Sequence, residues 1–366
     1  MGSPRVTPLK EWYRGRRVFV SGHTGFKGAW LVAWLRDAGA TVTGYALAPE
    51  SGAASLYELA GVGDGITSVI ADLSDAATLS ATLASAQPEI VIHMAAQSLV
   101  RRSYRHPIDT LVTNVIGTAL LLEAARTVAS VKAIVVVTSD KCYENDGTGT
   151  PYTESHAMGG HDVYSASKGC TELVAAAYRR SFLAAGGVSV STARAGNVIG
   201  GGDWAEDRLI PDLMVTAAEG GITELRNPAA TRPWQFVLEP LRGYLMLAKA
   251  QIEQGEQFAD GWNFGPEPRD AVPVREVARR MRVSWERVRV SESPIKPELH
   301  EAETLVLDCT KARTELGWVP ALTLDDALRL TTDWYRAYAA DPGSMRALVD
   351  RQLREYEKAV QRTGGS

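Results

Sequence analysis

The chain has 366 residues, enough for one large domain or two smaller ones. Its 39 Lys+Arg and 43 Asp+Glu residues give a formal net charge of −4, which excludes a polybasic nucleic-acid-binding protein as the default interpretation. No apolar run has the length of a membrane span, and the polar stretch 1–16 lacks the apolar core of a signal peptide. The three cysteines (Cys142, Cys170 and Cys309) fit neither a disulfide framework nor a zinc site. We therefore expect a cytoplasmic globular protein without metal, nucleic acid or membrane among its partners.

Apolar strand-like runs alternate with helix-like stretches along the first two thirds of the chain. The predicted strands cover 17–21, 41–47, 68–70, 89–93, 132–138 and 188–193, and the predicted helices cover 25–38, 76–86, 108–128 and 164–185. This alternation predicts an α/β fold of the doubly wound Rossmann type, a parallel sheet with helices on both faces. Ligands of such folds bind beyond the carboxyl ends of the strands.

The last third is less regular. A loop-rich region opens at Gly200, and its prolines favour irregular structure: Pro211, Pro228, Pro233 and Pro240. A helix is predicted over 324–338, with Thr323 and Asp326 as its capping pair. The charged end, 351–366, is expected to fray after a final helix.

A glycine motif of the form G-x-x-G-x-x-G lies between the first predicted strand and the first predicted helix. Glycines allow a tight turn and close approach of the backbone to a pyrophosphate, and the helix N-terminus supplies free N–H groups. The alternative is a plain glycine-rich turn. The candidate cofactor-binding residues of this motif are Gly22, His23, Thr24, Gly25, Phe26, Lys27 and Gly28.

The positions after the second and third strands bear on the identity of the dinucleotide. No acidic residue follows the second strand before Glu50, and no arginine is there, so the residues leave NAD and NADP both open. Asp72 and Leu73 follow the third strand. There the Asp72 carboxylate either accepts a hydrogen bond from an adenine amino group or caps the next helix.

A catalytic pair is predicted on the helix 164–185, where Tyr164 and Lys168 share one face through their i, i+4 spacing. A lysine ammonium beside a phenol favours the phenolate, which lets Tyr164 act as a base. Ser139, Asp140 and Lys141 emerge together at the end of the most apolar predicted strand. A simple strand-end turn is the alternative for that string.

Together these residues resemble the extended short-chain dehydrogenase/reductase family. The likeness runs from about Gly15 to Tyr338 and is closest to the CDP-glucose 4,6-dehydratases within it. It is carried by the strings GHTGFKG (22–28), HMAAQ (93–97), TSDKCY (138–143), RAGNVIGGGDW (194–204), RLIPD (208–212), RNP (226–228) and RPWQ (232–235). One departure is Phe236, where the family pattern has histidine, and it bears either on packing or on the nucleotide base.

The resemblance implies NAD as cofactor and a dehydration by internal hydride transfer, from the sugar C4 to NAD and then to C6. Tyr164 would take the proton of the 4-hydroxyl, Ser139 would hydrogen-bond it, and Lys168 would lower the pKa of Tyr164. Asp140 would protonate the leaving oxygen, and Lys141 would serve as the C5 base. The resemblance adds further cofactor contacts at Ala95, Ala96, Gln97, Asn114 and Thr138.

The implied substrate is a nucleotide sugar, with CDP-glucose favoured and CDP-4-keto-6-deoxy-glucose as product. Arginine suits a diphosphate because its guanidinium makes bidentate contacts. The candidate substrate-binding residues are Ser139, Asn197, Arg208, Arg232, Gln235, His300 and Glu301. The resemblance also implies a homodimer, with the helices 108–128 and 164–185 forming a four-helix bundle.

The implied division of the chain has four parts. Residues 1–14 form a tail, and 15–200 form the NAD-binding domain, to which 234–260 return. Residues 201–233 and 261–345 form a smaller mixed α/β substrate domain, and 346–366 a C-terminal helix and tail. Two other functions stay open: a nucleotide-sugar 4-epimerase or other dehydrogenase on the same scaffold, and a non-enzymatic dinucleotide-binding sensor.

Overall fold

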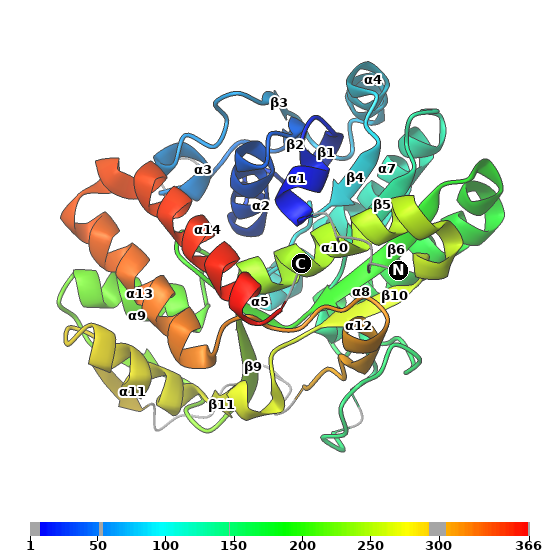
Figure 1. Ribbon diagram of the computed structural model, residues 1–366. Helices are drawn as coiled ribbons and strands as arrows, with labels where there is room; N and C mark the ends of the chain where they lie inside the picture. Colours follow the sequence, from blue (N-terminus) through cyan, green and yellow to red (C-terminus); the bar gives the residue numbers. More distant parts are fainter. Residues whose placement is uncertain (1–7, 51–53, 146, 293–304, 365–366) are drawn as a thin grey trace, which may run out of the picture.

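A seven-stranded sheet, parallel at every pairing, forms the centre of the molecule (Figure 1). The computed structural model describes residues 8–50, 54–145, 147–292 and 305–364. The strand order is β10-β6-β5-β4-β1-β2-β3, so the chain winds outward in both directions from β1. The strands are β1 (Arg17–Ser21), β2 (Thr41–Ala46), β3 (Thr67–Ile70), β4 (Ile90–His93), β5 (Ala133–Val137), β6 (Ser189–Ala195) and β10 (Gly261–Phe264).

Helices cover both faces of this sheet, as the sequence predicts for a doubly wound fold. Successive side chains of β5 enter different cores: Val135 packs with one cluster and Ile134 with the other. The helices on the first face are α2 (Phe26–Asp37), α10 (Leu238–Gln254) and α14 (Met345–Arg362). Those on the second face are α4 (Ala76–Ala86), α7 (Gly117–Arg126) and α8 (Val163–Tyr178). Strands β4 and β5, in the middle of the sheet, are buried on both faces, so their residues are almost continuously apolar rather than alternating.

The second part of the molecule is built around two small sheets. One has the order β11-β9-β7, and the other pairs β12 with β8. Their strands are β7 (Asn197–Ile199), β8 (Thr223–Leu225), β9 (Thr231–Phe236), β11 (Ala271–Pro273) and β12 (Val290–Glu292). The larger helices here are α9 (Leu209–Ala218), α11 (Val274–Ser284) and α13 (Leu324–Ala340). The remaining helices are α1 (Leu9–Tyr13), α3 (Leu56–Leu59), α5 (Val100–Arg105), α6 (Pro107–Leu111) and α12 (Thr310–Thr314).

Most predicted elements of the first two thirds agree with the structure, but two long helices are interrupted. The stretch predicted as one helix over 108–128 is α6, a π-helical segment Val112–Ile116 and then α7. The stretch 164–185 is α8 followed by a π-helical segment Arg179–Leu183. The predicted capping pair is confirmed, because Thr323 and Asp326 form a reciprocal capping box at the start of α13.

The prediction of a loop-rich region after residue 200 is wrong. This region contains α9, β9 and α10. Pro211 and Pro240 are each the third residue of a helix, α9 and α10. The first turn of a helix needs no intrahelical N–H donor, so a proline there does not break it.

Two predicted domain boundaries also change. Strand β10 pairs with β6 at the edge of the central sheet, although 261–345 were assigned to the substrate domain. Part of the expected tail 1–14 is helix α1, and the Tyr13 hydroxyl donates to the Leu245 carbonyl at 2.8 Å.

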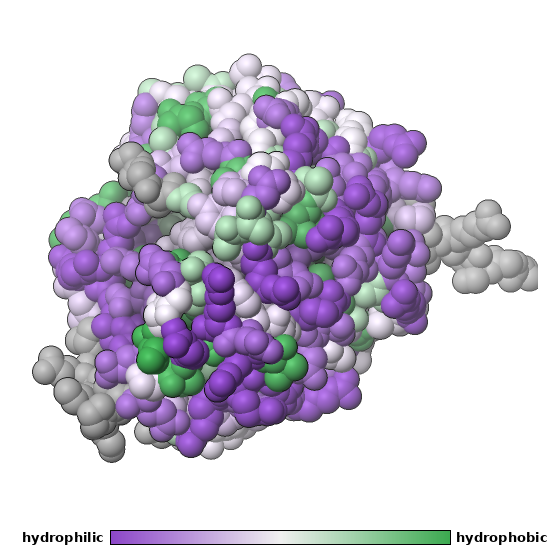
Figure 2. Space-filling model, turned by 90° about the vertical axis from the view of Figure 1, so that its left-hand side faces the viewer, coloured by the Kyte–Doolittle hydropathy of each residue, from purple (hydrophilic) through white to green (hydrophobic). Residues whose placement is uncertain are grey.

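The expected frayed end is instead an ordered helix. Helix α14 runs to Arg362, and its apolar face is buried against α2, where Trp34 and Tyr356 meet edge to face. The charged residues of α14 alternate with this buried stripe, which is the pattern of an amphipathic surface helix. Figure 2 shows the face of the molecule that carries α13 and α14, and it is mostly hydrophilic with separate apolar patches.

One helical stretch of the described chain, 107–126, is long and apolar enough to cross a membrane by length and composition alone. Its mean hydropathy is 1.4, and 44% of the apolar window is buried inside the protein. Leu121 and Leu122 of this stretch pack beneath the central sheet. The apolar character of α7 is therefore that of a core helix.

Candidate active site

A cavity of about 700 Å³ lies beyond the carboxyl ends of the central strands. One wall consists of the residues that follow β1, β4, β5 and β6. The other wall consists of β7, the start of α9, β8 and β9. The position matches the ligand site expected for a doubly wound sheet.

The glycine turn between β1 and α2 lines one end of this cavity. Gly22 has φ +78°, and a Cβ there would lie 2.7 Å from the Ala95 nitrogen. A Cβ on Gly28 would lie 2.0 Å from the Gly22 carbonyl oxygen, so no side chain fits at either position. Gly25 is the N-cap of α2 and provides no side-chain cap, which leaves the first N–H groups of the helix free for a ligand. The turn therefore fits a pyrophosphate.

Asp72 and Leu73 also line this end of the cavity, together with Ala95 and Ala96. Asp72 does not cap α4, because Asp75 does so by accepting from the Thr78 N–H at 3.0 Å. The Asp72 carboxylate accepts from the Ser74 N–H instead. Of the two interpretations that the sequence left open for Asp72, the helix cap is thus excluded.

Three predicted cofactor-binding side chains do not line the cavity. The ring of His23 is buried against Gly44 and bonds Ser68 Oγ at 2.7 Å, and burial lowers the pKa of His23 to about 4. Gln97 and Asn114 bond each other through side chain and backbone, with 2.8 Å from the Gln97 N–H to Asn114 Oδ1. Their side chains hold the loop after β4 onto the neighbouring helices.

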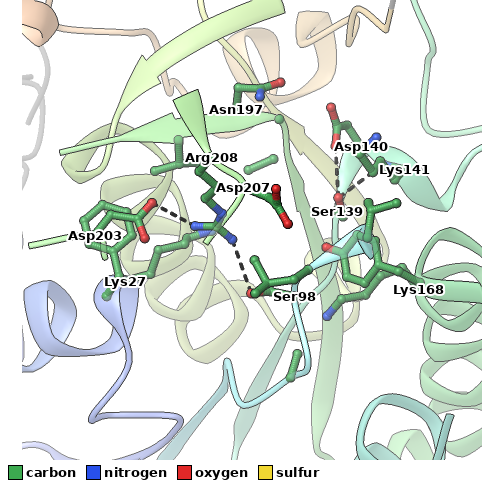
Figure 3. Close-up of a pocket in the computed structure, with 18 of the residues that line it drawn as sticks. Lys27, Ser98, Ser139, Asp140, Lys141, Lys168, Asn197, Asp203, Asp207 and Arg208 are labelled. Atoms are coloured by element: carbon green, nitrogen blue, oxygen red, sulfur yellow. Dashed lines mark hydrogen bonds and ion pairs between the residues drawn. The ribbon is translucent and has the colours of Figure 1, made fainter. Parts of the chain in front are cut away.

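The turn after β5 brings Ser139 and Asp140 together at the cavity, where they lie side by side (Figure 3). Ser139 Oγ donates to Asp140 Oδ1 at 2.9 Å and accepts from the Lys141 N–H at 3.2 Å. Asp140 is 6% exposed, and burial raises the pKa of its carboxyl, with Lys141, Ser139 and Arg232 acting in the opposite direction. Asp140 is thus held as a carboxyl that can carry a proton and give it away.

Tyr164 and Lys168 lie opposite this turn on α8, and both line the cavity. Tyr164 hydrogen-bonds with Ser139, yet burial raises the pKa of Tyr164 to about 12. The Lys168 ammonium donates to the Val137 carbonyl at 3.3 Å, and burial lowers the pKa of Lys168 to about 8. The expected lowering of the Tyr164 pKa by Lys168 is thus absent in this structure, since desolvation of the phenol is the larger effect.

Lys27 reaches the same space from the first turn of α2 (Figure 3). Its ammonium donates to the Tyr244 hydroxyl at 2.9 Å. Burial, together with the nearby charges of Lys168 and Arg208, lowers the pKa of Lys27 to about 7, and the Asp140 charge acts in the opposite direction. Lys27 is therefore an amine of the cavity interior, not a solvated surface lysine.

A buried polar network lies behind the catalytic turn. Glu172 accepts from Thr138 Oγ1 at 2.5 Å and from Thr192 Oγ1 at 2.6 Å. Arg194 binds both Glu172 carboxylate oxygens, at 2.9 and 2.8 Å, and donates to the Tyr143 hydroxyl. This network ties α8 to the ends of β5 and β6, so it fixes the elements that carry Tyr164 and Ser139 relative to each other.

The predicted substrate-binding residues divide into three groups. Ser139, Asn197, Arg208 and Arg232 line the cavity. Gln235 does not; its side chain is buried and donates to the Phe264 carbonyl at 2.9 Å. His300 and Glu301 lie outside the described residues. Four of these predictions are thus consistent with a substrate contact, and Gln235 holds β9 against β10.

Arg208 is held in place by two partners across the cavity (Figure 3). It donates to Asp203 Oδ2 at 2.9 Å and to Ser98 Oγ at 3.2 Å. The Asp203 charge raises the pKa of Arg208. Sequence reasoning missed Asp203 and Ser98, although Asp203 belongs to one of the strings that carry the resemblance.

Phe236 lies in the core and not in the cavity. Its ring is 1% exposed and meets Trp30 edge to face. The departure from the family pattern at this position is therefore a matter of packing, not of base recognition.

The chain matches the family model described as GDP-mannose 4,6 dehydratase over residues 19–331. It is 45% identical over 360 residues to a CDP-glucose 4,6-dehydratase of Salmonella typhimurium, covering 96% of this chain and 99% of that protein. It is 28% identical to a dTDP-glucose 4,6-dehydratase of Xanthomonas campestris, covering 86% of this chain and 92% of that protein.

Solved structures of similar proteins were also found. DesIV, a dTDP-glucose 4,6-dehydratase from Streptomyces venezuelae with NAD and TYD bound, is 27% identical with a TM-score of 0.75. That match covers 88% of this chain and 98% of DesIV. A UDP-glucose 4-epimerase from Thermotoga maritima has a TM-score of 0.76 at 22% identity, over 87% of this chain and 98% of the epimerase, which establishes the shared fold.

Proposed function

The chain belongs to the GDP-mannose 4,6 dehydratase family of nucleotide-sugar enzymes, and from this we propose that it is an NAD-dependent CDP-glucose 4,6-dehydratase. The reaction would convert CDP-glucose into CDP-4-keto-6-deoxy-glucose and water. The observation that carries the proposal is the grouping of Tyr164, Ser139, Asp140 and Lys141 in one cavity with a pyrophosphate-shaped glycine turn. A dehydratase needs groups that remove protons and a group that protonates the leaving oxygen, and this cavity has candidates for each.

The cavity fits NAD at the end formed by the glycine turn. Gly22, Gly25 and Gly28 would hold the pyrophosphate, and Asp72 and Leu73 would contact the adenosine side. The chemistry that NAD supplies when bound is reversible hydride acceptance, and its positive ring also favours a phenolate nearby. The charge of this ring matters because the protein, chiefly through burial, raises the pKa of Tyr164 to about 12.

The first step that the protein's own residues perform is removal of the proton from the sugar 4-hydroxyl. Tyr164 is the base, because its phenol lies in the cavity and hydrogen-bonds with Ser139. The Ser139 hydroxyl, which lines the cavity, would also hydrogen-bond the sugar 4-hydroxyl and so orient it. Lys168, one helical turn after Tyr164, adds positive charge on the same face of α8 and would bind the nicotinamide ribose.

The elimination of water falls to the adjacent pair after β5. Once C4 is a ketone, the hydrogen at C5 is acidic, and we assign Lys141 as the base that takes it. Asp140 would give its proton to the leaving C6 oxygen, and its raised pKa suits this acid role. Gly196 lies behind the Asp140 carboxylate, where a Cβ would come within 3.1 Å of Oδ2, so this position keeps room for the acid.

The test is incubation of the purified enzyme with NAD and CDP-glucose in deuterated water. The expected product is a 4-keto-6-deoxy sugar with solvent deuterium at C5, detected by mass spectrometry and NMR. An epimerised hexose would instead establish a 4-epimerase on this scaffold. Tight dinucleotide binding without turnover of CDP-, dTDP- or GDP-hexoses would establish a sensor.

The Lys141→Met variant tests the C5 base separately. It should lose deuterium incorporation at C5 and turnover by about 100-fold or more, the range of a general base, while dinucleotide binding stays unchanged. Normal incorporation in this variant would remove Lys141 from the mechanism.

We further propose that the enzyme is a homodimer. Ile108, Val112 and Ile116 are 67%, 39% and 51% exposed along one helical line, and Leu173 and Phe182 are exposed on and just after α8. A second copy would cover both helices in a four-helix bundle. Light scattering at the mass of two chains supports this, and a single-chain mass contradicts it.

We also propose the division of labour between the two parts of the molecule and a cytoplasmic location. The central sheet with its helices would bind NAD, and the part built on β7, β8, β9 and β11 would bind the nucleotide. Cys142, Cys170 and Cys309 are all free thiols, in keeping with a reducing compartment.

A further inference from the structure

Two arginines that line the cavity share one carboxylate between them. Arg226 Nη1 lies 2.6 Å from Asp207 Oδ1, and its Nη2 donates to the Asp207 carbonyl at 3.2 Å. Arg101 Nη1 lies 3.5 Å from the same Asp207 Oδ1. Asp212 adds a weaker contact, 3.7 Å from Arg226 Nη2. All four residues line the cavity, and Figure 3 shows Asp207 between Ser139 and Arg208.

The two arginines come from opposite walls. Arg101 is on α5, next to the loop that follows β4, and Arg226 directly follows β8 in the second part of the molecule. Asp207 stands between them on the loop before α9. An anion bound at the position of the Asp207 carboxylate would therefore contact both walls at once.

Asp207 is held there in an unusual backbone conformation. Its φ is +62°, and Gln87 is the other non-glycine residue with positive φ in the described part of the chain. Aspartate tolerates this left-handed region better than most residues but is not at its most stable there. The conformation places the carboxylate in the cavity, and the ion pairs with Arg101 and Arg226 hold it.

The ion pairs of Asp207 are also easier to replace by another anion than the ion pair between Asp203 and Arg208. The side chain of Asp207 is 33% exposed, with its arginine partners at 31% and 38%, so water screens these pairs. The Asp203 side chain paired with Arg208 is only 6% exposed, and the Asp203 carbonyl is bonded by Tyr335. Asp203 is thus a fixed partner, whereas Asp207 can be displaced by a stronger anion.

We propose that Arg101 and Arg226 form a second binding pair for the nucleoside diphosphate, beside Arg208 and Arg232, and that Asp207 is the exchangeable counter-ion that the diphosphate displaces. This inference rests on the proposed function for the identity of the ligand. A diphosphate offers more negative charge and more acceptor oxygens than one carboxylate, so it is the better partner for two guanidinium groups. On displacement, the loop at Asp207 is free to leave its left-handed conformation.

The test is calorimetric titration of CDP, and separately of cytidine, into wild-type protein and single variants. Asp207→Asn keeps the size and the tolerance of positive φ but removes the competing charge, so CDP should bind about 3- to 10-fold more tightly. Arg226→Gln and Arg101→Gln should each weaken CDP binding by about 10-fold. Cytidine, which has no phosphate, should bind equally to all of them.

Glu253→Gln is the matched control, because it removes one negative charge from an exposed position of α10 that does not line the cavity. It should leave CDP affinity unchanged. If the Asn variant fails to fold, Asp207→Gly removes the same carboxylate without backbone strain.

Two results would overturn the inference: CDP binding to Asp207→Asn equal to or weaker than in Glu253→Gln, or a gain that cytidine shares. If the wild type binds UDP or dTDP in place of CDP, the proposed substrate is wrong. The same variants titrated with that diphosphate then still decide whether Asp207 is its competitor.

Discussion

The two walls of the cavity hold their charges in opposite ways. Behind the wall formed by the central sheet, Arg194 and Glu172 are each 5% exposed and hydrogen-bonded to strand-end partners. On the other wall, Asp207 and Arg226 pair with a third of each side chain open to solvent. The first wall is preorganised, as the reacting atoms of a sugar require. The second can rearrange, as a binding site for a large, charged nucleotide requires.

The difference follows from where each wall lies in the fold. Strand ends that are buried between two helical layers leave no room for water, so every polar group there needs a protein partner. On the second wall, the side chains of Glu206, Asp207 and Arg226 are partly open to solvent, so water satisfies what the protein does not.

The largest effect is expected for Tyr164→Phe, which removes only the hydroxyl that we propose as the base. Turnover of CDP-glucose should fall by about 10³-fold, within the range of general base catalysis, while the free energy of unfolding stays nearly unchanged. Tyr178→Phe, on the same helix but outside the cavity, is the matched control and should keep full activity. Full activity in Tyr164→Phe would remove the tyrosine from the mechanism.

Breaking the buried ion pair should have the largest effect on stability. Glu172→Gln leaves the Arg194 guanidinium buried without its counter-charge, so the free energy of unfolding should fall by about 3–5 kcal/mol. Urea denaturation measures this directly. A loss below about 1 kcal/mol would show that this wall is no more rigid than the other.

Acid should lower the free energy of unfolding through the buried His93 at the end of β4. His93 bonds Ser21 and Thr118 between β4 and α7, and burial lowers the pKa of His93 to about 3. Below pH 6.5, His93 binds a proton in the unfolded chain but not in the folded protein. The free energy of unfolding therefore falls as the pH falls, until the pKa of the folded His93 is reached. The slope from this histidine is about 1.4 kcal/mol per pH unit.

Unfolding measured between pH 6 and pH 4.5 checks this slope. A His93→Asn variant should show a pH dependence that is shallower by about that amount than in the wild type. Equal slopes in the two proteins would mean that the folded His93 is protonated.

The smallest effect on stability is expected on the second wall of the cavity, the one that can rearrange. Arg105 and Glu206 form an ion pair in which each side chain is more than half exposed, 55% and 54%. Glu206→Gln should therefore change the free energy of unfolding by less than about 1 kcal/mol. A loss as large as that of Glu172→Gln would erase the contrast between the two walls.

The sequence predicted the central sheet well because its signal is local. The apolar runs at 17–21 and 132–138 are strands whose both faces are buried, and the glycines at 22, 25 and 28 permit one turn geometry. Local signals also predicted three residues of the cavity. Helical spacing places Tyr164 and Lys168 there, and the end of a strand places Ser139 there.

What the sequence did not predict depends on contacts between distant residues. Nothing local marks Arg101 and Asp207 as partners across the cavity, because Arg101 lies about a hundred residues before Asp207. Gln97 and Gln235 were predicted as ligand contacts from motif strings, but their amides bond the protein itself. A polar residue in a motif can serve the ligand or the fold, and only its neighbours in space decide which.

Helix α10 and strand β10 raise a question about synthesis of the chain on the ribosome. Both complete the central sheet, yet both follow the segments of the second part in the chain. Gln251 of α10 donates to the Ile134 and Ser189 carbonyls of β5 and β6. These hydrogen bonds can form only after a residue more than fifty positions later in the chain has been synthesised. Until then a nascent chain of about 200 residues exposes the edge of β6 and one apolar face, the surfaces on which chaperones act and aggregates start.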